Sequence, residues 1–184
     1  MSSPAVLVVI DVQKGFTDPY WGSSHNPECE DNIRALLEYW RAKGWPIVLV
    51  QHNSLSATSP LHPGQVGNDL QPGIDGPHDL LVTKTVNSAF YGEPNLDAWL
   101  KAKGYSSLVI CGITTNFCCE TTARMAGNLG YDVEFAFDAT RTFDHPALDG
   151  SMIPAELIAR VTAANLNGEF ASVVSTADIL TAHA

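Results

Sequence analysis

The chain has 184 residues, 45% of them hydrophobic and 16% charged, and its formal net charge is −10 at pH 7. This length fits one domain with its own core, and so low a charged fraction argues against disorder, so we predict a single domain over residues 1–184. An acidic surface repels nucleic-acid phosphates and anionic lipid. We therefore expect neither nucleic acid nor a membrane as a partner.

The N-terminal segment predicts no secretory leader. Residues 1–4 carry no basic stretch, and the apolar run Ala5–Ile10 is too short for a signal core or a bilayer span. No Cys-x-x-Cys pair or matching His pair suggests a zinc site, and the cysteines stand at uneven spacing: Cys29, Cys111, Cys118 and Cys119. We therefore expect free thiols in a reducing compartment and a cytoplasmic protein.

In chain order, short apolar runs alternate with segments of helical periodicity. The predicted strands are Val6–Ile10, Ile47–Val50, Leu80–Val82, Leu108–Cys111, Val133–Phe137 and Ala171–Val174. The predicted helices, of which the first three are followed directly by glycine, are Asn32–Lys43, Leu96–Lys103, Phe117–Leu129 and Pro154–Leu166. Strands that are apolar on both faces are typical of a parallel sheet covered by helices. The alternation therefore predicts an open, twisted α/β sheet with right-handed crossovers.

The segment 53–77 interrupts this alternation, because prolines and glycines recur throughout it. A loop of this length in a compact domain usually carries function or covers a site, and an ordered surface excursion is the equally open alternative. The segment has no diagnostic motif, so its sequence leaves open whether it closes over a site.

Three polar residues stand near the ends of predicted strands, at the edge where open parallel sheets bind ligands. Asp11 follows the first strand, Lys84 comes after the third, and Cys118 falls at the start of the helix that follows the fourth. A helix start carries partial positive charge and free N–H groups, and both favour the thiolate, which is the reactive form of cysteine. Together the three residues fit covalent catalysis by a nucleophile, an acid–base carboxylate and a cation.

Each of these residues has a simpler explanation when taken alone. An aspartate after a strand is often a turn or helix cap, and a lysine there is most often a solvated charge. A cysteine early in a helix more often packs in the core than reacts. The catalytic interpretation therefore depends on the joint placement of all three at one edge of the sheet.

The segments around these residues carry a family resemblance. Residues 11–16 read Asp-Val-Gln-Lys-Gly-Phe, residues 84–90 read Lys-Thr-Val-Asn-Ser-Ala-Phe, and residues 111–118 read Cys-Gly-Ile-Thr-Thr-Asn-Phe-Cys. In this order they resemble the Asp-x-Gln, lysine and Gly-x-x-Thr-x-x-Cys motifs of the isochorismatase-like cysteine hydrolases, which include nicotinamidases and N-carbamoyl-amide hydrolases. The resemblance extends over nearly the whole chain.

The resemblance implies a Rossmann-like three-layer sandwich with a six-stranded parallel sheet, and a catalytic triad of Cys118, Asp11 and Lys84. It also implies a non-proline cis peptide bond at Ile113–Thr114, which would direct the N–H of Thr114, with that of Cys118, into an oxyanion hole. We accordingly expect a small-molecule substrate, no cofactor, and a homo-oligomer, either a dimer or a tetramer.

Two positions depart from the family pattern. Nicotinamidases of the family carry Asp-x-His after the second strand and another His downstream for a metal ion, whereas residues 52–54 here read His-Asn-Ser. Because a metal would lose a carboxylate and an imidazole, we predict no metal and regard nicotinamide as a less favoured substrate. Cys119 stands where the family commonly has an aliphatic residue, and we expect it to pack inward.

Four side chains are predicted to line the substrate pocket: Phe16, His52, Phe90 and Phe117. Phe16 and Phe90 are chosen because each follows a catalytic segment. His52 follows the second strand, and a structural, hydrogen-bonded role is its open alternative. We further predict that Gln13 orients Asp11 through its side-chain amide.

The leading functional hypothesis is a hydrolase that cleaves a C–N bond in a small amide, ureido or carbamoyl compound through a thioester on Cys118. Isochorismatase-type hydrolysis of a vinyl ether, which some family members perform without needing the cysteine, is the second enzyme hypothesis. A redox sensor that uses Cys118 and Cys119, or a non-catalytic binding protein on the same fold, are the remaining alternatives. The sequence does not define the substrate.

Overall fold

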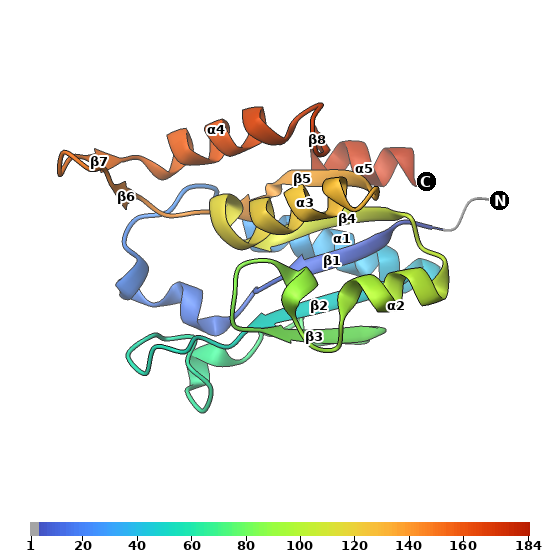
Figure 1. Cartoon of the computed structure of the whole chain (residues 1–184), viewed down its shortest axis with the longest axis horizontal. Helices are drawn as coiled ribbons and strands as arrows, with labels where there is room; N and C mark the ends of the chain where they lie inside the picture. Colours follow the sequence, from blue (N-terminus) through green and yellow to red (C-terminus); the bar gives the residue numbers. More distant parts are fainter. Residues whose placement is uncertain (1–3) are drawn as a thin grey trace.

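The computed structural model describes residues 4–184 and has three layers, with a central sheet between two groups of helices (Figure 1). Six parallel strands form this sheet in the order β3-β2-β1-β4-β5-β8. They are β1 Val6–Ile10, β2 Ile47–His52, β3 Leu80–Lys84, β4 Ser107–Ile113, β5 Asp132–Arg141 and β8 Ser172–Val174. The predicted α/β sandwich with a six-stranded parallel sheet is therefore confirmed.

Helices cover both faces of the sheet because the central strands are apolar on both sides. All five residues of β1 are buried, and alternate residues belong to two separate core clusters. α1 and α5 pack on one face of the sheet, and α2, α3 and α4 pack on the other (Figure 1). The helices are α1 Cys29–Lys43, α2 Leu96–Lys103, α3 Glu120–Asn128, α4 Ala155–Leu166 and α5 Thr176–Ala182.

Two predicted helix ends are confirmed at glycines. Gly44 and Gly104 follow α1 and α2 in left-handed conformations, with φ of 64° and 73°, and their N–H groups bond back to the last turn. α1 begins at Cys29 rather than at the predicted Asn32. Its first turn contains two acidic residues, which stabilise the positive end of a helix.

The structure also contains short elements for which the sequence has no periodic signal. α5 begins with a capping box in which Ser175 and Asp178 bond each other's backbone N–H groups. A two-stranded hairpin, β6 His145–Pro146 and β7 Met152–Ile153, lies at one end of the molecule beside the start of α4 (Figure 1). Within residues 4–184, no helix has the length and apolar character needed to cross a bilayer.

The loop 53–77 is ordered by hydrogen bonds to the end of β2. The side-chain amide of Asn68 donates to the carbonyl of His52 at 3.0 Å and to that of Leu61 at 2.9 Å. The carbonyl of Asn68 in turn accepts the side-chain amides of Gln13 and Gln51 at 2.8 and 2.7 Å. The loop is therefore fastened to the sheet edge at which the predicted catalytic residues lie.

Candidate active site

The carboxyl ends of three strands bring the three predicted catalytic side chains together. Asp11 directly follows β1, Lys84 is the last residue of β3, and Cys118 lies in the π-helical turn Thr115–Cys119 after β4. The Lys84 ammonium lies 2.6 Å from Oδ2 of Asp11 and 3.3 Å from Sγ of Cys118. One nitrogen therefore donates hydrogen bonds to both the carboxylate and the sulfur.

Burial controls the charges of this group. The side chains of Asp11 and Lys84 are both 0% exposed. Burial alone would lower the pKa of Lys84, but the charges of Asp11 and Cys118 raise it, so the lysine stays an ammonium. Burial raises the pKa of the Cys118 thiol well above its usual range, the Asp11 charge raises it further, and Lys84 only partly offsets both. Burial and the Asp11 charge therefore oppose the thiolate that a helix start favours, and the Lys84 ammonium favours it.

The backbone at Asp11 adopts a conformation that is unusual for a residue with a side chain. Asp11 has a φ of 52°, in the left-handed region, which costs a non-glycine residue about 1–2 kcal/mol. Its N–H donates to the carbonyl of Val50 at 2.9 Å, and its own carbonyl accepts the N–H of Gln13 at 2.8 Å. Oδ1 of Asp11 is buried and has no hydrogen-bond partner within the described chain. This oxygen is therefore free to accept a proton.

A glycine lets β4 lie close to the end of β1. Gly112 has a φ of 130°, and a Cβ at this position would lie 2.0 Å from the carbonyl oxygen of Ile10. The pairing of β4 with β5 also shifts register between Ile110 and Gly112. The close approach holds the cysteine turn beside Asp11, which follows Ile10 in the chain.

The turn that carries Cys118 differs from a regular helix start. The predicted cis peptide bond at Ile113–Thr114 is confirmed. The predicted continuous helix 117–129 is instead divided into the π turn and α3. The carbonyl of Thr114 accepts the N–H groups of Phe117 and Cys119 at 3.3 and 3.1 Å. Such π turns are rare and occur frequently at functional sites.

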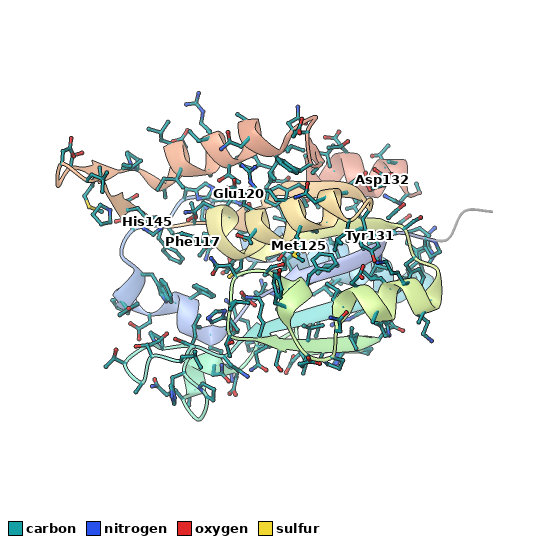
Figure 2. All side chains as sticks on the ribbon, in the orientation of Figure 1. Phe117, Glu120, Met125, Tyr131, Asp132 and His145 are labelled. Carbon is teal, nitrogen blue, oxygen red and sulfur yellow. The ribbon has the colours of Figure 1, made fainter. Side chains whose placement is uncertain are left out.

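A cavity of about 180 Å³ borders the catalytic group. Three predicted pocket residues, Phe16, His52 and Phe117, line it. Phe117 is 43% exposed and packs edge-on against His145 at a ring separation of 5.1 Å (Figure 2). Thr114 also lines the cavity, and its buried hydroxyl has no hydrogen-bond partner in the part of the chain described.

Three further residues line this cavity that were not among the predicted pocket residues: Trp21, Leu61 and Asn87. Oδ1 of Asn87 lies 3.8 Å from Sγ of Cys118, from which it accepts a weak hydrogen bond. Asn87 stands three residues after Lys84 in a motif already singled out, but nothing in that motif indicates which of its side chains faces the sulfur. Leu61 comes from the loop 53–77, which therefore forms part of the wall of the site.

Phe90 and Gln13 do not occupy the positions that their predicted roles require. Phe90 is only 3% exposed and stacks on Tyr131 in the core, rather than lining the cavity, because the turn that follows β3 directs it inward. The side-chain amide of Gln13 does not bond the Asp11 carboxylate. It exchanges hydrogen bonds with the backbone of His52, at 3.0 Å as donor and 2.9 Å as acceptor. Gln13 therefore connects the end of β2 to the segment that follows β1 by hydrogen bonds.

Cys119 follows Cys118 in the chain but does not line the cavity. It is 0% exposed and belongs to the core cluster between the sheet and α3, as expected for an inward-packing residue. All four cysteines are free. Burial raises the pKa of Cys119 well above its usual range, which leaves it an inert thiol.

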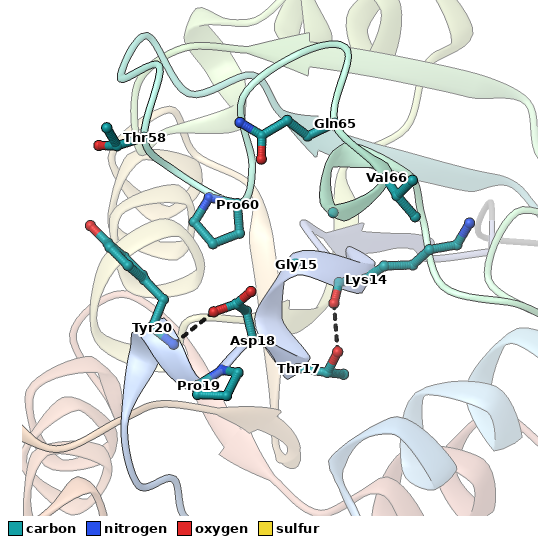
Figure 3. Close-up of a pocket in the computed structure, with 11 residues that line it drawn as sticks. Lys14, Gly15, Thr17, Asp18, Pro19, Tyr20, Thr58, Pro60, Gln65 and Val66 are labelled. Carbon is teal, nitrogen blue, oxygen red and sulfur yellow. Dashed lines mark hydrogen bonds between the residues drawn. The ribbon is translucent and has the colours of Figure 1, made fainter.

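A larger hollow of about 630 Å³ lies between the segment 14–20 and the loop 53–77 (Figure 3). Its wall includes Lys14, Asp18, Tyr20 and Gln65. It contains none of the three converging groups, and Lys14 is paired with Asp69 at 2.9 Å outside it. Of the two, the smaller cavity is the one lined by Asp11 and Cys118.

The site does not fit the metal that the nicotinamidase relatives imply. Of residues 52–54, only His52 offers a strong metal ligand, and its Nδ1 lies 3.2 Å from the Lys84 ammonium. Ligand-type atoms of Asp11, His52 and Cys118 lie within 4.8 Å of one another. The Lys84 ammonium forms a hydrogen bond with one atom of each of these three side chains. The lysine therefore supplies the positive charge that a metal ion would otherwise bring to this cluster.

Comparison with known proteins agrees with this geometry. The isochorismatase domain model matches residues 5–176. The isochorismatase family protein YrdC of Bacillus subtilis is 38% identical over 182 residues, which cover 98% of this chain and 96% of that protein. Nicotinamidase 3 of Arabidopsis thaliana is 30% identical, over 83% of this chain and 80% of its own length. A crystal structure of a family member from Chromobacterium violaceum superposes with a TM-score of 0.93 at 38% identity, covering 99% of this chain and 94% of that one. The chain therefore belongs to the isochorismatase family of hydrolases.

Proposed function

We propose that this hydrolase cleaves a C–N bond in a small amide, ureido or carbamoyl compound, with Cys118 as the nucleophile. The single observation that carries the proposal is the contact of the Lys84 ammonium with both the Asp11 carboxylate and the Cys118 sulfur. Nucleophile, proton acceptor and cation then share one buried site next to a cavity, which is the arrangement that covalent catalysis requires.

The first half of the reaction acylates the cysteine. Asp11 takes the proton of the Cys118 thiol, for which its unpartnered Oδ1 is available. The sulfur attacks the carbonyl carbon, and the oxyanion accepts hydrogen bonds from the backbone N–H groups of Thr114 and Cys118. Asp11 then gives its proton to the leaving nitrogen, the C–N bond breaks, and a thioester remains on Cys118.

The second half returns the enzyme to its starting state. Water attacks the thioester carbonyl while Asp11 accepts a proton from it. The C–S bond then breaks, the acid is released, and the proton returns to the sulfur. Lys84 holds Asp11 in place throughout and stabilises the negative charge on Cys118 while its proton is away.

The test is a screen of small amides, ureas and carbamoyl compounds for ammonia release by the wild-type protein and by Cys118→Ala. We expect at least one compound to be hydrolysed by the wild type and its turnover to fall by about 10³-fold or more in the variant. Circular dichroism and the melting temperature serve as controls for an intact fold. Full activity of Cys118→Ala on the same compound would remove the proposal, and turnover of isochorismate by Cys118→Ser would favour vinyl-ether hydrolysis instead.

A further inference from the structure

We infer that the active site selects electrically neutral substrates: small uncharged amides or ureas that carry one apolar group, with carboxylate-bearing compounds rejected. This inference rests on the proposed function, because it names the class of compound on which Cys118 would act. It follows from the charges that line the cavity, from the engagement of all three N–H donors of the buried Lys84 ammonium, and from the cavity's size.

The walls of the cavity provide no positive charge for a substrate carboxylate. The lining residues are Asp11, Phe16, Trp21, His52, Leu61, Asn87, Thr114, Phe117 and Cys118. Burial and the nearby Lys84 lower the pKa of His52, so its imidazole is neutral near pH 7. The remaining ionised lining group is the carboxylate of Asp11, which is already paired with Lys84 and attracts no anion.

Lys84 cannot serve as that missing cation. An ammonium has three N–H donors, and the acceptors of all three are already in place: Oδ2 of Asp11, Nδ1 of His52 and Sγ of Cys118. Its side chain is 0% exposed and is not part of the cavity wall. A substrate carboxylate would have to displace one of these three acceptors to reach it.

The neighbouring cavity offers no cation either. It measures about 280 Å³ and shares Trp21, Thr114 and Phe117 with the first. Its further lining residues are Tyr20, Phe143, Asp144 and His145, and they include no lysine or arginine. A substituent that extends past Phe117 therefore enters a space whose fixed charge is again negative.

Uncharged polar groups and apolar walls remain to recognise a substrate. The Thr114 hydroxyl is buried without a partner in the described residues, and Asn87 contributes a side-chain amide beside the sulfur. Both groups can hydrogen-bond a neutral amide or urea. Phe16, Leu61 and Phe117 provide an apolar wall. An apolar cavity of about 150 Å³ holds one benzene ring, so 180 Å³ admits one ring or branched alkyl group.

Two alkylating reagents of nearly equal size test the charge selection directly. Iodoacetamide is neutral and iodoacetate is anionic, and each forms a C–S bond with loss of iodide. Peptide mass spectrometry would measure the rate at which each labels Cys118 in the full-length protein, divided by its rate with glutathione at the same pH. We expect the normalised ratio of iodoacetamide to iodoacetate to be about 100 or more, since the anion meets Asp11 and no cation.

A charge placed in the wall should reverse this preference. Phe117→Arg puts a guanidinium at the shared wall of the two cavities and is expected to lower the ratio by at least about tenfold. Phe117→Leu removes the ring without adding charge and should keep the ratio high. Leu148→Arg is the matched control, because it makes the same change in net charge at a fully exposed residue between β6 and β7, and it should leave the ratio unchanged.

A wild-type ratio near one, or failure of iodoacetamide to label Cys118, would overturn the inference. The result is separate from that of the hydrolysis test. A ratio near one together with ammonia release that depends on Cys118 would remove the charge selection and leave the proposed function standing. A high ratio together with full activity of Cys118→Ala would support the charge selection at Cys118 and remove the proposed function.

Discussion

At the scale of single residues, the site is controlled by a buried ion pair that also touches the nucleophile. Burial disfavours a charged Lys84, and its contacts with Asp11 and Cys118 together raise its pKa above the usual value. Because burial and the Asp11 charge raise the Cys118 pKa, attack by the sulfur requires that its proton be taken up, and the unpartnered Oδ1 of Asp11 is available to accept it.

Removing one partner of the ion pair should strongly destabilise the fold. Lys84→Met leaves a buried carboxylate unpaired, and Asp11→Asn leaves a buried ammonium unpaired, at a cost of about 3–5 kcal/mol each in the free energy of unfolding. The double variant Asp11→Asn/Lys84→Met should lose clearly less than the sum of the single losses. Urea denaturation at neutral pH measures all three.

Lys101→Met provides the control for this cycle. It breaks a pair with Asp97 in which the lysine side chain is 62% exposed, and should cost no more than about 1 kcal/mol. Equal losses for Lys84→Met and Lys101→Met, or strict additivity in the double variant, would contradict a tightly coupled buried pair.

At the scale of elements, the site exists because three strand ends and one irregular turn meet. The strands were predictable from sequence, since each is a short, mostly apolar run. The π turn was not, because helical periodicity cannot distinguish one extra residue at the start of a helix. α5 was missed for another reason: Thr176–Ala182 is short and consists largely of small and polar residues, which have no amphipathic pattern.

The close approach of β4 to β1 makes Gly112 the most restrictive position of these elements. Gly112→Ala adds a left-handed strain of about 1–2 kcal/mol and an overlap with the Ile10 carbonyl that costs about 1–3 kcal/mol more. We expect the free energy of unfolding to fall by about 3 kcal/mol, and hydrolysis to fall with it because Asp11 is displaced.

Gly104→Ala is the matched comparison. Gly104 also has a positive φ, of 73°, but a Cβ there meets no atom within 4 Å. Only the strain of about 1–2 kcal/mol applies, and the site is unaffected. Thermal melts of the two variants would show whether the overlap matters, and equal losses of stability would argue against it.

At the scale of the whole molecule, the sequence predicts the fold and the three converging side chains more completely than it predicts the residues that line the pocket. Asp11, Lys84 and Cys118 could be found because the ends of parallel strands share one edge. Phe90 was wrongly assigned because nearness in sequence to Lys84 does not determine which way a side chain points, and Leu61 could not be assigned because the loop 53–77 has no diagnostic motif. The expected homo-oligomer and cytoplasmic location stay predictions.

Formation of a thioester is the most direct test of the account. A substrate found in the screen is mixed with the wild-type protein, and the reaction is quenched in acid within the first turnover. Mass spectrometry then measures the mass of the peptide that contains Cys118. Hydroxylamine, which competes with water for a thioester, is added in parallel. We predict a mass gain equal to the acyl group on Cys118 or, where deacylation is fast, an acyl hydroxamate product; neither forms with Cys118→Ala. Turnover by the wild type with no acylated Cys118 and no hydroxamate would contradict the account.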